Sequence, residues 1–204
     1  MTRHKIAIVV GSLRRDSINR KVAQSICAFA GERLDCSIVE IGDLPLYNQD
    51  YDTEGSPPQY ARFRDQIAAA DGILFVTPEY NRGVPGVLKN AIDVGSRPWG
   101  QSVWDKKPAA IISASPGAIG GFGASHQLRQ ACVFLNMPVM QQPEAYLGGV
   151  SDASFDSGSC LKDGPLKDLV MNLAAAFSEW VGLITRSRQL LAEDADHQQK
   201  AAAA

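Results

Sequence analysis

Five short runs of apolar residues recur along the chain, and the segments between them carry apolar residues at helical spacing. The runs are residues 6–10, 37–41, 72–76, 109–114 and, more weakly, 145–147. Runs that are apolar at successive positions are typical of strands covered on both faces, as in a parallel sheet. The pattern therefore predicts an α/β fold, a three-layer sandwich around a five-stranded parallel sheet.

Five amphipathic segments follow these strands, and local start or stop signals mark their ends. Ser17 is a candidate N-cap for the first predicted helix, which begins near residue 18. Ser56, Pro57 and Gln59 together predict a capped start for the second, with proline at its first position. Gly95 predicts the end of the third helix, because glycine readily adopts the left-handed conformation of a C-terminal cap.

Length and composition indicate one globular domain. The chain has 204 residues, of which 45% are hydrophobic and 21% charged, as in ordinary globular proteins. We expect a single domain over residues 1–190. We expect residues 191–204 to be a polar tail, either disordered or an addition to the natural sequence.

Charge and cysteine content exclude several classes of partner. A net charge of −2 creates no basic field, so we expect no nucleic-acid partner. The apolar run after the N-terminus is too short for a signal peptide or a membrane span. The four cysteines form no CxxC pair, and they and the three histidines lack metal-ligand spacing. We therefore expect a cytoplasmic protein with reduced, isolated thiols, no metal and no membrane contact.

Three loops follow predicted strands and should meet at one edge of the sheet: residues 11–19, 77–85 and 113–123. In open α/β sheets, ligands bind outside the carboxyl ends of the strands, where the strand order reverses. These loops are therefore the candidate binding site.

The first loop, GSLRRDSIN at residues 11–19, has the chemistry of a phosphate site. A helix N-terminus presents free N–H groups and partial positive charge. Ser12, Ser17 and Asn19 add polar side chains, and Arg14 adds a charged fork. The loop has neither the Walker A spacing nor a GxGxxG fingerprint, so a phosphate monoester is favoured. Taken alone, the loop also fits a capped helix start with two surface arginines.

The second and third loops are rich in proline and glycine. TPEYNRGVPG at residues 77–86 could present backbone groups and Tyr80 to a flat heterocycle, or form a rigid turn. SASPGAIGGFG at residues 113–123 lets the backbone approach a ligand closely, or forms a flexible loop. Each signal is weak singly, but all three fall at the correct strand ends for one pocket.

Taken together, these motifs resemble the NADPH-dependent FMN reductases of flavodoxin-like fold, a group with bacterial chromate and quinone reductases and some azoreductases. The family signature GSxRxxSxN is intact at residues 11–19, and PEYN stands at 78–81. VPGVLKNAID at 84–93 and LPLYNQD at 44–50 extend the similarity, which covers about residues 5–149. The resemblance implies a flavodoxin-like doubly wound sheet, FMN as cofactor, and NADPH or NADH as electron donor.

The resemblance also implies roles for residues of the three loops. The FMN phosphate would be held by Ser12, Arg14, Ser17, Ile18 and Asn19, the last two partly through backbone. The isoalloxazine would be bordered by Pro78, Glu79, Tyr80 and Asn81, and approached from its other edge by Ser115 and Gly117. Family members are homodimers or homotetramers, with the helix after Pro85 in the interface, which would place Arg97 and Trp99 near a neighbouring active site.

From this we predict an NAD(P)H oxidoreductase with ping-pong kinetics. A nicotinamide passes hydride to flavin N5 and leaves, and a small acceptor then takes the electrons. Quinones, chromate, azo dyes and flavins all suit an open flavin face. Because the chemistry lies on the cofactor, no catalytic side chain is expected.

Other readings remain open at this point. A flavodoxin-like electron carrier or redox sensor would use the same fold without nicotinamide turnover. A flavin reductase that releases reduced FMN would differ only in flavin affinity. A hydrolase is disfavoured because the chain has no GxSxG elbow.

Overall fold

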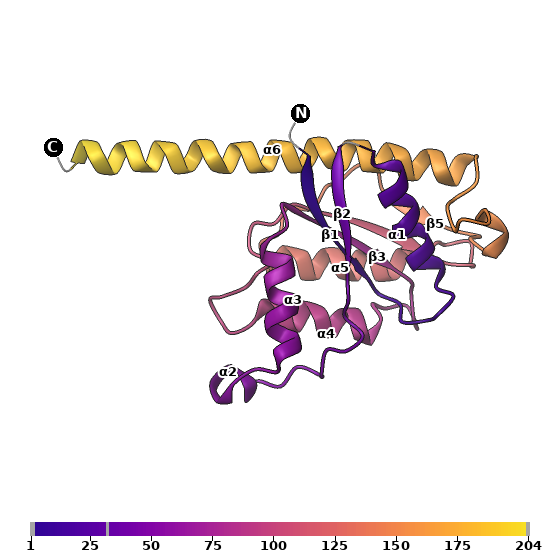
Figure 1. Ribbon diagram of the computed structural model, residues 1–204, viewed down its shortest axis with the longest axis horizontal. Helices are drawn as coiled ribbons and strands as arrows, with labels where there is room; N and C mark the ends of the chain where they lie inside the picture. The colour runs from indigo at the N-terminus through magenta and orange to yellow at the C-terminus, as the bar shows by residue number, and fades with distance from the viewer. Residues whose placement is uncertain (1–2, 32, 203–204) are drawn as a thin grey trace.

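A five-stranded, all-parallel sheet forms the centre of the molecule (Figure 1). The structure is a computed structural model that describes residues 3–31 and 33–202. Its strands are β1 (His4–Val10), β2 (Leu34–Val39), β3 (Gly72–Thr77), β4 (Ala109–Ala114) and β5 (Ala145–Leu147). They lie in the order β2-β1-β3-β4-β5, which is the flavodoxin-like doubly wound order. The predicted fold class is confirmed.

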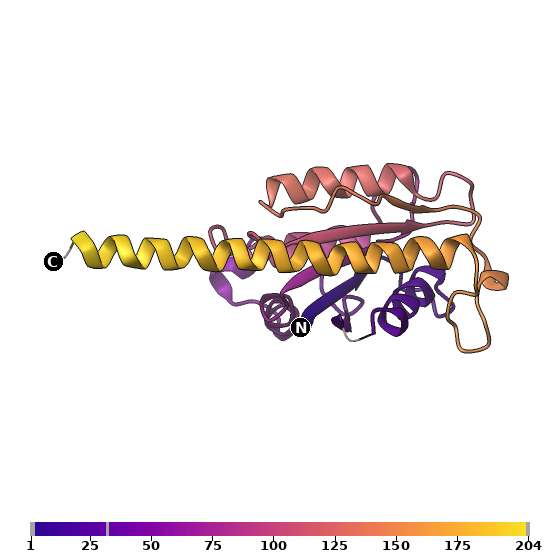
Figure 2. The same cartoon turned by 90° about the horizontal axis from the view of Figure 1, so that it is seen from above.

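Helices cover both faces of the sheet (Figures 1 and 2). They are α1 (Ile18–Phe29), α2 (Tyr51–Glu54), α3 (Pro58–Ala68), α4 (Gly86–Ser96), α5 (Phe122–Phe134) and α6 (Pro165–Ala202), with a short 3₁₀ turn at Asp152–Ser154. One buried cluster joins α1 and α6 to the sheet, and a second joins α3, α4 and α5 to its opposite face. The short helix α2 lies in the loop after β2.

The alternation of side chains along the strands explains the two clusters. In β1, Ile6, Ile8 and Val10 belong to the α1–α6 cluster, whereas Ala7 and Val9 belong to the other. Successive side chains of a strand point to opposite faces, so a strand buried on both faces must be apolar at every position. This burial holds the carboxyl ends of β1, β3 and β4 in line, where the three loops begin.

The predicted boundaries of the second strand and of the second helix were wrong. The second strand runs from Leu34 to Val39 rather than over 37–41, because its register pairs His4 with Leu34 and Val9 with Val39. The second predicted helix, α3, begins at Pro58 with Pro57 at the N-cap and no side-chain cap bond. The Tyr60 N–H bonds to the Pro57 carbonyl at 2.9 Å, so Ser56 lies outside the helix and caps nothing.

Gly95 does not end its helix. It is buried within α4, which continues to Ser96. A Cβ at Gly95 would lie 2.4 Å from Nε1 of Trp104, closer than any real contact. The glycine is therefore needed for close packing of a tryptophan against α4.

The thiols of Cys27 on α1 and Cys36 on β2 are not isolated from each other. A hydrogen bond from the Cys36 thiol lowers the pKa of Cys27, and the same bond, together with burial, raises the pKa of Cys36. Such a pairing between a helix and a strand has no signal in local spacing. The structure records both thiols as free.

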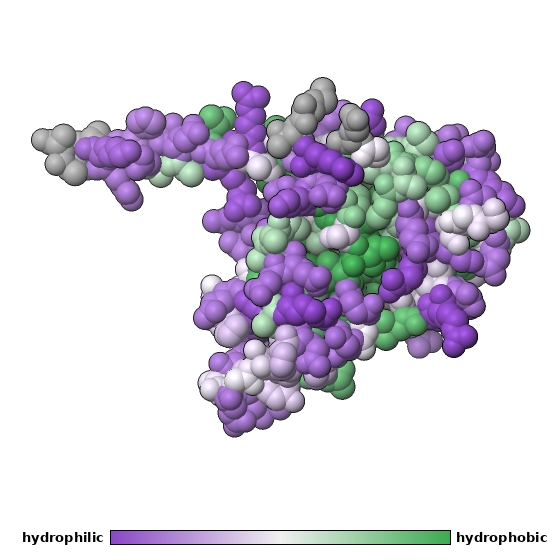
Figure 3. Space-filling model, in the orientation of Figure 1, coloured by the Kyte–Doolittle hydropathy of each residue, from purple (hydrophilic) through white to green (hydrophobic). Residues whose placement is uncertain are grey.

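The last helix, α6, extends well beyond the body of the molecule (Figure 2). Val170, Leu173 and Phe177 are buried against the sheet, whereas the protruding part is mainly hydrophilic (Figure 3). Residues 191–202 are described as helix rather than as an irregular tail; the domain boundary at residue 190 stays a prediction. No helix in the described part of the chain has the length and apolar character needed to span a bilayer.

We expect that a chain ending at residue 190 keeps the stability of the full chain. Leu190 and Leu191 are exposed, and substitutions or losses at such surface positions change stability by no more than about 0.5 kcal/mol. Urea unfolding of both chains measures the difference. A loss of several kcal/mol would place the end of the domain beyond residue 190.

Candidate active site

The three loops meet at the carboxyl edge of the sheet and enclose a small hollow of about 110 Å³. Its lining consists of Ser12, Arg14, Ser17, Ile18, Asn19, Pro78, Glu79, Tyr80, Ala114, Ser115 and Pro116. All predicted site residues except Asn81 and Gly117 are among them. Ala114 and Pro116 were not predicted, although their place beside Ser115 was a signal for them.

The start of α1 presents backbone donors to this hollow. Ser17 is the N-cap, as predicted, and its Oγ accepts the Arg20 N–H at 3.1 Å. Ile18 and Asn19 begin the helix, so their N–H groups have no partner within it. Ser12 and Ser17 are buried, while Arg14 is exposed where it lines the hollow. The arrangement suits a phosphate, which would meet free amides, hydroxyls and one guanidinium.

The Asn19 side chain makes a tertiary contact that local sequence could not show, and its role at the FMN phosphate stays a prediction. Its Nδ2 donates to the Ala114 carbonyl at 3.2 Å, which fastens α1 to the end of β4 and fixes the orientation of the amide. Its Oδ1 is buried without a hydrogen-bond partner, and Asn19 is only 4% exposed. A buried acceptor of this kind requires a donor. A ligand hydroxyl would satisfy it, whereas a phosphate oxygen would not.

The second loop forms one wall of the hollow and then turns sharply. Thr77 Oγ1 donates to the Pro78 carbonyl at 2.8 Å, close to the end of β3. Asn81 and Arg82 have φ values of 52° and 67°, and they carry the chain away from the hollow. This turn explains why Asn81 is absent from the lining, and its role at a flavin stays a prediction.

The third loop forms the opposite wall and is pressed against the chain that follows β5. Ser115 N–H donates to the Leu147 carbonyl at 3.0 Å, and Ser115 Oγ accepts the Gly117 N–H at 3.1 Å. A Cβ at Gly148 would lie 2.3 Å from the Ala118 carbonyl oxygen. Close packing of backbone on backbone therefore requires glycine here and makes the loop well supported rather than flexible.

FMN fits these residues. The hollow of about 110 Å³ compares with ~30 Å³ for one water in the liquid. The hollow therefore has room for a group of several atoms, such as a phosphate. The unpartnered Asn19 Oδ1 matches a hydroxyl of the ribityl chain. Tyr80 and Ser115, which line the same hollow, would border the ring.

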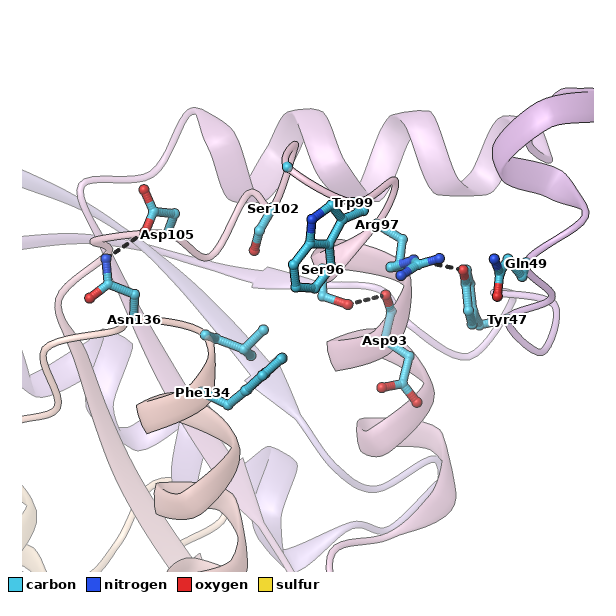
Figure 4. Close-up of a pocket in the computed structure, with 12 residues that line it drawn as sticks. Tyr47, Gln49, Asp93, Ser96, Arg97, Trp99, Ser102, Asp105, Phe134 and Asn136 are labelled. Atoms are coloured by element: carbon cyan, nitrogen blue, oxygen red, sulfur yellow. Dashed lines mark hydrogen bonds between the residues drawn. The ribbon is translucent and has the colours of Figure 1, made fainter.

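A larger hollow of about 680 Å³ lies at the carboxyl ends of α4 and α5 (Figure 4). Trp99 and Phe134 point toward one another across it, and both are 75% exposed. α4 has 11 residues, about 16 Å at 1.5 Å per residue, so this hollow is remote from the flavin loops within one chain. It contains no predicted cofactor residue.

One side of this larger hollow is held by an ion pair. Arg97 donates through Nε to the Tyr47 hydroxyl at 2.9 Å and to Asp52 at 3.1 Å. Tyr47 in turn donates to Asp52 at 3.0 Å. Burial, followed by the hydrogen bond to Asp52, raises the pKa of Tyr47, which keeps the phenol protonated. The network ties the loop containing α2 to the end of α4.

Comparison with known proteins places the chain in a family. The profile of the family described as NADPH-dependent FMN reductase matches residues 4–152. The chain belongs to this family. The match spans all five strands and all three loops of the small hollow.

Individual relatives agree with that placement. A quinone reductase of Pseudomonas putida is 57% identical over 180 residues, which cover 88% of this chain and 96% of the relative. A 2-hydroxy-1,4-benzoquinone reductase of a Burkholderia species is 47% identical over 178 residues, covering 87% of this chain and 96% of the relative. Among solved structures, the flavoenzyme FerB, an NAD(P)H:(acceptor) oxidoreductase of Paracoccus denitrificans, matches with a TM-score of 0.83 and 37% identity. That match covers 88% of this chain and 97% of the other.

Proposed function

We propose that this protein is an FMN-dependent NAD(P)H oxidoreductase that reduces quinones. The observation that carries the proposal is the hollow between the three loops, where helix amides, Ser12, Ser17 and Arg14 lie beside the unpartnered Asn19 Oδ1. Membership of the FMN reductase family and the quinone reductase relatives support the same activity. An electron carrier without nicotinamide turnover is not favoured by these relatives.

In this proposal the protein binds and orients, and the cofactor reacts. Bound FMN supplies the two-electron redox chemistry between nicotinamide and acceptor. The α1 N-terminus, Ser12, Ser17 and Arg14 hold the phosphate, and Asn19 receives a ribityl hydroxyl. Pro78, Glu79, Tyr80 and Asn81 border the ring on one side, and Ser115 and Gly117 approach it on the other. No side chain is required as an acid or base.

The proposal includes further acceptors, an oligomeric assembly and a cellular location. Chromate, azo dyes and free flavins are further candidates, because none needs a closed substrate pocket. A homodimer or homotetramer is supported by the exposed Trp99, Val133 and Phe134 at the ends of α4 and α5. The composition and the free thiols support a cytoplasmic location.

The visible spectrum of the purified protein tests the proposal. We expect an oxidised flavin spectrum that anaerobic NADPH or NADH bleaches and that a quinone then restores. Stoichiometric cycles of bleaching and recovery distinguish a retained cofactor from a released one. A flavin that no nicotinamide can bleach would instead indicate a carrier or sensor, and failure to bind added FMN would refute the proposal.

A further inference from the structure

The turn at residues 80–83 has a backbone conformation that is costly in free energy. Tyr80 N–H donates to the Gly83 carbonyl at 3.0 Å, and Gly83 N–H donates to the Tyr80 carbonyl at 2.9 Å. Between them, Asn81 and Arg82 both have left-handed φ values. Asparagine tolerates that region, but a long side chain such as arginine adopts it at a cost in free energy. Strained turns of this kind persist when neighbouring structure holds them.

Glu79 provides the first attachment of this turn to α5. Its Oε2 accepts the Ala124 N–H, in the first turn of α5, at 3.0 Å, and its side chain is 12% exposed. α5 begins after Gly121, which offers no side-chain cap, and it has no acidic residue in its first turn. Glu79 therefore supplies the carboxylate that the helix N-terminus favours, from a loop 45 residues away in the chain.

Gln127 provides the second attachment. Its Oε1 accepts the Val84 N–H at 2.7 Å, immediately after the turn. The turn and α5 also pack closely against each other at Gly83 and Gly123. A Cβ at Gly123 would lie 2.9 Å from Glu79 Oε2 and 3.0 Å from the Arg82 carbonyl oxygen, and one at Gly83 would lie 3.0 Å from Gln127 Oε1. The turn is therefore held at both of its ends by one helix.

We propose that Glu79 and Gln127 are positioning residues, which clamp the 80–83 turn to α5 and so set the spacing between the second and third loops. α5 starts directly where the third loop ends, so its first turns support both walls of the small hollow. The consequence for flavin binding rests on the proposed function; the clamp itself does not. Glu79 acts in this scheme through its hydrogen bond to α5 rather than through contact of its charge with the ligand.

Amide hydrogen exchange in the FMN-free protein tests the clamp directly. The N–H groups of Tyr80 and Gly83 each donate to the other residue's carbonyl, so their exchange reports opening of the turn. For Glu79→Ala we expect exchange at these amides to be faster by about 10-fold or more, as for the loss of a hydrogen bond to a charged group. Gln127→Met keeps the length of the side chain but removes the acceptor. For this variant we expect exchange at the same amides to be faster by roughly 3- to 10-fold.

Matched variants separate the clamp from a general loss of structure. Gln130→Met changes an exposed glutamine one turn further along α5 and should leave exchange in the turn unchanged. Glu79→Gln retains an oxygen that can accept the Ala124 N–H, so it should recover most of the protection lost in Glu79→Ala. If the Tyr80 and Gly83 amides exchange at the same rate in Gln127→Met as in Gln130→Met, the clamp is refuted.

Titration with FMN then tests the effect on the hollow. Glu79→Ala and Gln127→Met should both weaken FMN binding and shift the visible flavin bands, with Glu79→Gln close to the unmodified protein in both readouts. If Glu79→Gln instead matched Glu79→Ala in affinity and bands, the charge of the carboxylate would act, on the ligand or on Arg82, whose Nη1 lies 3.4 Å from Glu79 Oε1, and the positioning role through Ala124 would be wrong. If the unmodified protein bound no FMN, the proposed function would fail while the exchange result still decided the clamp.

Discussion

Replacing Arg14 by alanine is expected to weaken FMN binding by about 1.5–3 kcal/mol, roughly 10- to 150-fold in Kd, as for hydrogen bonds to charged groups. Arg14 is the arginine that lines the small hollow, next to the start of α1. Its side chain is exposed, so the loss should fall on ligand affinity and leave the stability of the FMN-free protein almost unchanged. Quenching of flavin fluorescence on titration measures the affinity.

The neighbouring Arg15 offers the control for this experiment. It is also exposed and carries the same charge, but it is not part of the lining. Arg15→Ala should therefore change the affinity far less than Arg14→Ala does, and any common part of the two effects measures long-range attraction. Equal losses in the two variants would remove Arg14 from the phosphate site.

The second large effect is expected in the core. Trp104→Ala should destabilise the fold by about 3–5 kcal/mol, the range for removing a buried tryptophan or phenylalanine. Trp104 is 0% exposed, its ring centroid lies 5.8 Å from that of Phe63 and 5.7 Å from that of Phe75, and its Nε1 donates to the Ile92 carbonyl at 2.9 Å. The substitution leaves a cavity against Gly95 and removes the hydrogen bond to the Ile92 carbonyl.

Trp99→Ala is the matched control, because Trp99 belongs to the same loop and is 75% exposed. Its replacement should change the free energy of unfolding by no more than about 0.5 kcal/mol. Chemical denaturation of both variants measures the contrast. Similar losses at the two positions would mean that Trp99 is covered in solution, as it would be in an assembly of several chains.

Local sequence could show only part of the candidate site. The spacing within residues 11–19 predicted the phosphate loop, because the N-cap, the first helical amides and Arg14 all lie within one turn of each other. Neither Glu79 nor Gln127 could be assigned as a clamp from sequence. Their partners, Ala124 and Val84, lie 45 and 43 residues away.

Local signals were also misread where tertiary contacts outweigh them. Gly95 was interpreted as the end of a helix, but the contact with Trp104 gives the position its glycine. The predicted place of Asn19 at the FMN phosphate stays a prediction, but local sequence gave no sign that its side-chain amide bonds to the Ala114 carbonyl at the end of β4, 95 residues away. In each case the residue type was a useful signal, but the residue that it contacts comes from another element of the fold.

The sequence by itself determined the sheet and its parallel character, and it indicated the edge at which we propose that FMN binds. Those features depend on the period of apolar positions and on chain connectivity, which are local properties. Only the tertiary structure decided that Trp104 is buried and Trp99 exposed, where the Glu79 carboxylate points and how far α6 continues. These depend on packing and hydrogen bonds between segments that meet only after folding, and such pairings leave no periodic trace in a single sequence.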